Sequence, residues 1–176
     1  MARQQKPAIT EIPAAETPRK SLFDRVAGYL DAHDWNYTAH QENSYFTMGC
    51  RIKDANVRVV LDVYEAEDWC RVLTYSTFPI YVPEQKRAIV AEAITRINYS
   101  IIYGNLEMDL KDGEIRVRTV VEGETQLSEG MIERVLNSNL NTSDRYFAPL
   151  MAVVFGNATP DTVVELASRN AEVTLQ

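Results

Sequence analysis

A pair of residues, Asp112-Gly113, separates two stretches of alternating apolar and polar residues, and no other feature of the chain restricts its fold as strongly. Aspartate and glycine tolerate the positive φ values that a two-residue β-hairpin turn requires. Residues 104–121 are therefore predicted to form a β-hairpin. If the loop has two residues, counting outward places apolar pairs on one face and oppositely charged pairs on the other. The charged pairs are Asp109–Arg116 and Glu107–Arg118.

Strand-like runs also precede the hairpin. In one of them Val57, Val59, Leu61 and Val63 alternate with other side chains, which is the period of a strand with one buried face. Short polar links separate the runs, so neighbouring strands are expected to be antiparallel. Together with the hairpin, these runs predict an antiparallel sheet of five to six strands. The runs are residues 35–41, 45–52, 57–64 and 69–77.

Amphipathic helices are predicted before, between and after the strands. A long apolar stripe follows Pro83, which suits a first helical turn, and Gly104 is expected to cap the end of this helix. The helix is expected to cover the apolar face of the sheet. Nearer the C-terminus, Pro149 is expected to begin a separate short helix that ends at Gly156. The other helices are predicted at residues 22–33, 129–139 and 160–168.

These elements define an α+β fold in the order α-β-β-β(-β)-α-β-β-α-α, with helices covering an antiparallel sheet. A chain of 176 residues, 45% of them hydrophobic, suits one domain of ordinary size, predicted here at residues 21–170. Residues 1–20 hold three prolines and no aromatic residue, and they are expected to be a flexible arm, either inert or ordered only on a partner. Residues 171–176 are expected to fray.

Charge and composition restrict the partners. The net charge of -7 repels phosphate backbones, and the basic residues form no run, so nucleic acid is not expected as a partner. No apolar stretch is long enough to cross a bilayer, and no signal-peptide core is present near the N-terminus, so a cytoplasmic protein without membrane contact is expected. Cys50 and Cys70 lie in strand-like runs without metal-ligand spacing and are expected to be reduced sheet residues.

Catalytic motifs are not recognisable. His33 and His40 stand near element ends without Asp-His-Ser or HxxxH spacing. The acidic group at residues 62–68 (Asp62, Glu65, Glu67, Asp68) lacks the alternate ligands and central glycine of a calcium loop, which favours a solvated turn. No GxSxG, GxGxxG or GxxxxGK[ST] motif occurs. The sequence therefore predicts no cofactor, no metal site and no enzyme activity.

Aromatic side chains are the candidate binding residues. They concentrate in the strand-rich half of the chain, where they would line a peptide groove or a dimer contact, or else pack within the sheet as cross-strand pairs. The candidates are Trp35, Tyr37, Tyr45, Tyr64, Trp69 and Tyr75.

The stretch INYSIIYGNLEMDLKDGEIRVRT, residues 97–119, resembles the YbjN family, a group described as bacterial sensory transduction regulators. The segments VPEQKRAIV and DRYFAPLMAVVFG agree with the family in the same order, so the resemblance covers residues 21–168. The resemblance implies a fold similar to the chaperones of type III secretion. Such chaperones are commonly dimers that hold extended peptide segments of their clients.

Two functions remain open at this point. The first is a non-catalytic protein-interaction module, chaperone-like or regulatory and homodimeric, that binds a protein or peptide through a sheet face or edge. The alternative is a small-molecule-binding sensor or an unrecognised enzyme, with a pocket between the long helix and the sheet.

Overall fold

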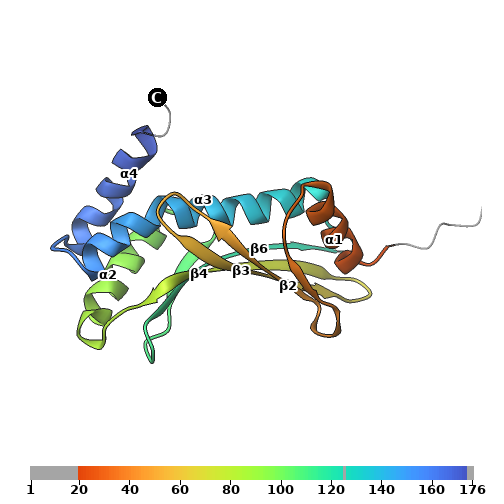
Figure 1. Cartoon of the computed structure of the whole chain (residues 1–176), viewed down its shortest axis with the longest axis horizontal. Helices are drawn as coiled ribbons and strands as arrows, with labels where there is room; N and C mark the ends of the chain where they lie inside the picture. Colours follow the sequence, from red (N-terminus) through yellow and green to blue (C-terminus); the bar gives the residue numbers. More distant parts are fainter. Residues whose placement is uncertain (1–19, 125, 174–176) are drawn as a thin grey trace, which may run out of the picture.

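The strands of the protein join into one antiparallel sheet of six, in the order β1-β2-β3-β4-β6-β5 (Figure 1). The computed structural model describes residues 20–124 and 126–173, so the predicted N-terminal arm lies outside it except for Lys20. The predicted α+β class and element order are confirmed, with the optional fourth strand present as β1. The strands are β1 (Thr38–His40), β2 (Tyr45–Arg51), β3 (Asn56–Glu65), β4 (Cys70–Tyr81), β5 (Asn105–Met108) and β6 (Glu114–Gly123).

The helices lie along one side of the sheet, which we call the covered face (Figure 1). The alternating residues of β3 that were predicted to share a face, Val57, Val59, Leu61 and Val63, are all buried there. The helices are α1 (Leu22–Ala32), α2 (Glu84–Ser100), α3 (Glu129–Val154) and α4 (Val163–Val173). Within the described residues, none of them is both long and apolar enough to span a bilayer. Residues 171–173 of the predicted frayed end belong to α4, and 174–176 lie outside the described residues.

The main cover of the sheet is α3, not α2 as predicted. α3 has 26 residues, about 39 Å at the helical rise, and packs along β4 and β6. α2 packs instead against β5, α3 and α4. Its buried side chains are confined to Val90, Ala93, Ile94 and Ile97, too short a stripe to cross six strands.

The break predicted at Pro149 is wrong, because α3 runs through it. A proline inside a helix removes one backbone hydrogen bond, which normally favours a helix start. Here Pro149 is itself buried, together with Phe147, Leu150 and Val153 on the same helix. The apolar burial on both sides of the proline offsets the lost hydrogen bond, so the two predicted helices are one.

The predicted register of the β5–β6 hairpin is wrong by two residues. Glu107 lies opposite Arg116, not Arg118, because the loop has four residues. Gly113 has a φ of 86°, whereas a two-residue type I′ turn would require a positive φ at Asp112 as well. The Asp112 carboxylate instead accepts the Glu114 N–H at 2.9 Å, which holds the wider turn. An even slip preserves the faces, so Leu106, Ile115 and Val117 are buried on the covered face, while Leu110 lies exposed in the loop.

Gly104 takes the positive φ expected of it, 85°, but does not cap α2. The helix ends at Ser100, and Ile101 follows it in an extended conformation. Gly104 lies directly before β5, where an added Cβ would come within 2.7 Å of the Arg118 carbonyl oxygen. Close packing of the turn against β6 therefore requires glycine here, rather than helix capping.

The edge strand β5 is closed by a side chain of α2. Asn98 accepts a hydrogen bond from the Leu106 N–H at 2.8 Å and donates one to the Leu106 C=O at 3.0 Å. Its amide therefore takes the place that a neighbouring strand would occupy at this residue. Exposed strand edges invite pairing with other chains, and covering them is a common protection.

Replacing Asn98 by alanine is expected to destabilise the fold by about 1–2 kcal/mol and to promote self-association, because both main-chain groups of Leu106 lose their partner. Urea unfolding and size-exclusion chromatography at increasing protein concentration would measure the two effects. Asn98→Asp is the matched control, since a carboxylate still accepts from the N–H but cannot donate to the C=O. Equal stability of Asn98→Ala and the unaltered chain would contradict this role.

Candidate functional site

The candidate site is the side of the sheet opposite the helices, which we call the open face. Within residues 20–124 and 126–173, no helix packs on it, and the four helices lie on the other side (Figure 1). Side chains at alternate strand positions point to this face. Its residues include Tyr45 and Thr47 of β2, Arg58, Val60, Asp62 and Tyr64 of β3, Arg71, Leu73, Tyr75 and Thr77 of β4, and Arg116, Arg118 and Val120 of β6.

Four apolar or aromatic side chains form a contiguous group in the middle of the open face. Val60 lies directly opposite Tyr75, and Leu73 lies directly opposite Val120. The two pairs occupy successive rows of the sheet, so their side chains are neighbours. We call Val60, Leu73, Tyr75 and Val120 the central patch. Val120 is 37% exposed and the other three are half-buried.

Arginine side chains border the central patch on the β6 side. The Arg116 guanidinium lies 4.3 Å from the centre of the Tyr75 ring, a cation–π contact. Glu107 of β5 pairs with Arg116 at 2.8 Å and with Arg118 at 3.3 Å. Burial alone would raise the pKa of Glu107, but hydrogen bonds from Asn105 and Arg116, with the charges of both arginines, lower it. Glu107 is thus ionised at neutral pH and holds both arginines in place.

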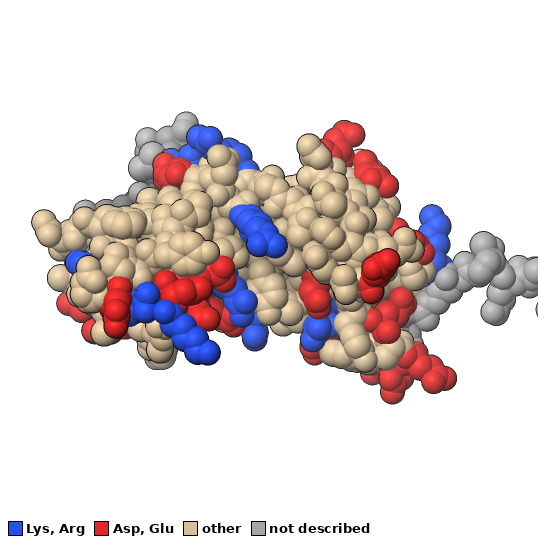
Figure 2. Space-filling view, turned by 60° about the horizontal axis from the view of Figure 1, so that its bottom comes forward, with Lys and Arg blue, Asp and Glu red and all other residues tan. Residues whose placement is uncertain are grey.

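Another arginine, Arg71, lies on the open face near the turn that joins β3 to β4. Arg71 pairs with Asp62 at 3.0 Å, and its guanidinium lies 5.8 Å from the Tyr64 ring centre and 5.7 Å from that of Trp69. The two aromatic rings contact each other at 4.9 Å between centroids. Figure 2 brings this side of the molecule forward and shows acidic and basic side chains in mixed groups over a largely uncharged surface.

The structure divides the six aromatic candidates. Tyr45, Tyr64 and Tyr75 occupy the open face, and Trp69 contacts Tyr64 there. Tyr45 stacks on His40 at 4.3 Å. Trp35 and Tyr37 instead pack against the core, and the Tyr37 hydroxyl donates to Asp31 at 2.8 Å. A binding role for any of the six stays a prediction.

The aliphatic residues of the central patch and the arginines beside it were not among the predicted binding residues. The alternation of side chains along the strands does indicate these residues. Val60 alternates with the buried stripe of β3, so it is an apolar side chain on the otherwise polar side of that strand. Leu73 on β4 and Val120 on β6 are likewise apolar side chains on the open face. The cross-strand register brings them together with Val60.

The histidines and acidic residues that were considered as catalytic or metal-binding groups form hydrogen bonds and ion pairs within the fold. His33 contacts the Tyr29 carbonyl oxygen at 2.9 Å, and His40 the Thr47 hydroxyl at 3.0 Å. In the acidic group, Asp62 pairs with Arg71 and Glu65 accepts the Leu22 N–H at 2.7 Å. Within the described part of the chain, no three His, Cys, Asp or Glu side chains are placed to hold a metal ion.

Both cysteines are buried on the covered face, as predicted, and neither forms a disulfide. Cys50 lies opposite Val57 at one end of β3, and Cys70 lies opposite Glu65 at the other end. Eight residues of strand, about 26 Å, therefore separate them, far beyond disulfide reach. Burial raises the pKa of the Cys50 thiol to about 11, so it is protonated and unreactive at neutral pH.

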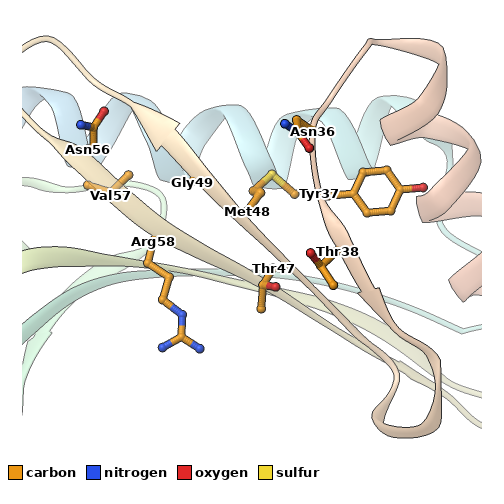
Figure 3. Close-up of a pocket in the computed structure, with 9 residues that line it drawn as sticks. All are labelled: Asn36, Tyr37, Thr38, Thr47, Met48, Gly49, Asn56, Val57 and Arg58. Carbon is orange, nitrogen blue, oxygen red and sulfur yellow. The ribbon is translucent and has the colours of Figure 1, made fainter.

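A hollow of about 640 Å³ lies beside the sheet at the end of β1 (Figure 3). The segment that enters β1 forms one wall, with Asn36, Tyr37 and Thr38, while β2 and β3 form the other. Tyr37 points away from the hollow's centre towards α1, and Arg58 extends from the opposite side of β3 (Figure 3). The hollow is broad and open, in contrast to an enclosed ligand cavity.

The fold and this surface define an α+β protein with a one-sided antiparallel sheet. The chain belongs to the YbjN family, whose model, described as "Putative bacterial sensory transduction regulator", matches residues 22–151. A solved structure described as "Crystal structure of YbjN, a putative transcription regulator from E. coli" is similar with a TM-score of 0.49 and 11% identity. The match covers 74% of this chain and 87% of that one. No curated protein matches the chain.

Proposed function

We propose that the protein is a non-catalytic regulatory module that binds another protein through the open face. The observation that carries this proposal is a six-stranded sheet with helices on one side only, whose other side presents the central patch. A sheet face that carries Val60, Leu73 and Tyr75 among arginines has the composition of an interface core with a polar rim. The family's description as a regulator supports the same function.

The size of the open face restricts the kind of complex. Six strands span about 24 Å at a spacing near 4.8 Å, and the paired region is about 20 Å long, which gives roughly 500 Å². A standard-size interface buries about 800 Å² on each partner. A complex confined to this face is therefore of the smaller, transient kind that suits regulation. A homodimer, a chaperone-like mode of binding and a cytoplasmic location remain predictions.

Replacing Leu73 by glutamate is expected to weaken partner binding at least about tenfold, because the new carboxylate would lie directly opposite Asp62 and would have to lose its water when a partner covers the patch. Immobilised protein would be incubated with lysate of the native cell at low salt, and captured proteins identified by mass spectrometry and then titrated individually. Gln85→Glu, on the exposed side of α2, is the control and should retain the partner.

The proposed function would be abandoned if no protein is captured specifically, or if Leu73→Glu captures the same partner with equal affinity. Turnover of a metabolite by the purified protein would also overturn it, in favour of the enzyme alternative.

A further inference from the structure

The edge of β2 carries main-chain groups that no strand covers. The Ile52 N–H donates to the Ala55 C=O and the Val63 N–H to the Ser44 C=O, which fixes the alternation of hydrogen bonds between β2 and β3. Even-numbered residues of β2 thus bond to β3, and odd-numbered residues direct their N–H and C=O groups the other way. β1 begins at Thr38, opposite Thr47, and so reaches no further along β2.

Gly49 and Arg51 are the odd-numbered residues that extend past β1. Their main-chain N–H and C=O groups have no hydrogen-bond partner among the residues that the structure describes. Gly49 lines the hollow of Figure 3, and Arg51 follows it two residues further along the same strand. Gly49 adds no side chain on the open face, and a Cβ there would meet no atom within 4 Å. A second chain in extended conformation has room to approach the strand edge at this point.

The two edges of the sheet therefore differ in how their outward main-chain groups are hydrogen-bonded. At β5, which has four residues, the Asn98 amide occupies both outward main-chain groups of Leu106, so Met108 is the one other residue of this strand that faces outward. At β2, two successive outward-facing residues, Gly49 and Arg51, keep their main-chain groups available, and Gly49 lines a hollow. Because uncovered edges invite strand addition, this contrast selects the β2 edge as the place where a peptide strand would join the sheet.

The charges near the β2 edge indicate which side chains a peptide strand that binds there would carry. Arg51 belongs to the edge itself, and Arg58 lies directly opposite Gly49 on β3. Within residues 20–124 and 126–173, neither guanidinium forms an ion pair, whereas Arg71, Arg116 and Arg118 all do. Two unpaired cations on a chain with a net charge of -7 favour carboxylates over cationic side chains in the incoming strand.

We propose that the β2 edge at Gly49 and Arg51 binds an extended acidic segment of a partner protein by strand addition, with carboxylates of that segment contacting Arg51 and Arg58. This inference rests on the proposed protein-binding function and assigns it a second contact beside the open face. Main-chain pairing supplies the binding, and the arginines supply the preference for acidic segments.

A labelled heptapeptide in which glutamate alternates with valine is the probe, and fluorescence anisotropy with the full chain is the measurement. Saturable binding is expected, with no binding of the counterpart that carries lysine for glutamate. Gly49→Pro removes the outward N–H and is expected to weaken binding at least tenfold, while Gly49→Ala should leave it unchanged. Proline is tolerated at an edge position whose N–H faces away from the sheet.

The combined Arg51→Glu and Arg58→Glu variant keeps the backbone intact and should reverse the preference towards the lysine peptide, so the proposal is testable even if Gly49→Pro does not fold. Leu73→Glu should still bind the peptide, which separates failure of the edge from failure of the open face. Binding of neither peptide, or equal binding by Gly49→Pro, overturns the proposal.

The β2 edge could instead be occupied by the chain's own N-terminal segment or by a second copy of the chain, and each of these predicts a different experimental result. If the acidic peptide binds only after residues 1–19 are removed, the chain's own N-terminal segment fills the edge and the proposal is wrong. If the Gly49 amide becomes protected from hydrogen exchange as the protein concentration rises without peptide, a second copy fills it, which also overturns the proposal.

Discussion

A chain that carries Gly113→Ala is expected to lose about 2–5 kcal/mol of folding free energy, because the new side chain meets both a backbone conformation and a neighbour that exclude it. The φ of 86° at Gly113 lies in the left-handed region, where an alanine is strained. An added Cβ would also lie 2.3 Å from the Val82 carbonyl oxygen and 2.7 Å from the Val82 nitrogen. Backbone atoms cannot turn aside as the end of a side chain can.

The position of Gly113 explains why the loss would spread beyond the turn. The Val82 N–H donates to the Gly113 C=O at 2.9 Å, so the tip of the β5–β6 hairpin is bonded to the link between β4 and α2. The Arg87 guanidinium of α2 adds hydrogen bonds to the loop carbonyls of Leu110 and Lys111, at 3.1 and 3.0 Å. Displacing the turn would disturb the start of α2 as well as the hairpin.

Urea unfolding followed by circular dichroism would measure this effect, and Gly28→Ala is the matched control. Gly28 is exposed in the middle of α1, and a Cβ there would meet no atom within 4 Å. Alanine is favoured over glycine inside a helix, so this variant should gain about 0.5–1 kcal/mol. Effects of the same sign and size for the two variants would contradict the argument.

The sequence predicted the elements whose periodicity is strong and local. The alternation in β3 and the apolar stripes of α1 and α2 depend on neighbouring residues alone, and the structure confirms them. The predicted loop length at Asp112-Gly113 is wrong because the same residues are compatible with a two-residue loop and with the observed four-residue loop. The choice between them depends on the Asp112 carboxylate and on the contact with Val82, and the second of these belongs to another part of the chain.

The open face was harder to predict for a related reason. Alternation shows which side chains of a strand share a face, but not which face the helices will leave uncovered. That depends on how far each helix extends, and Pro149 hid the true length of α3. The aromatic side chains opposite the stripe were predicted as binding candidates, but Val60, Leu73 and Val120 were not. Their grouping into the central patch becomes visible only through the register of β3, β4 and β6.

Asn139 was predicted to lie at the end of a helix, and it is instead an interior residue of α3 that forms hydrogen bonds to the sheet. Asn139 is fully buried on α3. The two hydrogens of its side-chain nitrogen are shared among the carbonyl oxygens of Thr74 and Val117, at 3.0 and 3.1 Å, and the Thr119 hydroxyl at 3.2 Å. Its oxygen accepts from the Ser76 hydroxyl. One amide thus fixes α3 to both β4 and β6.

Asn139→Ala is expected to destabilise the protein by about 2–4 kcal/mol, since it leaves the buried Ser76 hydroxyl without its acceptor and opens a small cavity. Asn141→Ala on the same helix is the control, and because Asn141 is exposed it should change the unfolding free energy by no more than about 0.5 kcal/mol. Denaturant unfolding of both variants makes the comparison, and equal values would show that the network adds nothing.

Asn139→Leu separates stability from positioning, because it keeps the volume but removes the side-chain hydrogen bonds of residue 139 to β4 and β6, while the Thr119 hydroxyl still donates to the Val135 carbonyl oxygen. If the network fixes where α3 lies on the sheet, this variant should exchange the amide hydrogens of β4 and β6 faster even where its unfolding free energy is partly restored by the apolar side chain. Three of the four residues of the central patch, Leu73, Tyr75 and Val120, lie on the reverse side of these same two strands. A loosened α3 should therefore also weaken partner binding at the open face, although no residue there has been changed.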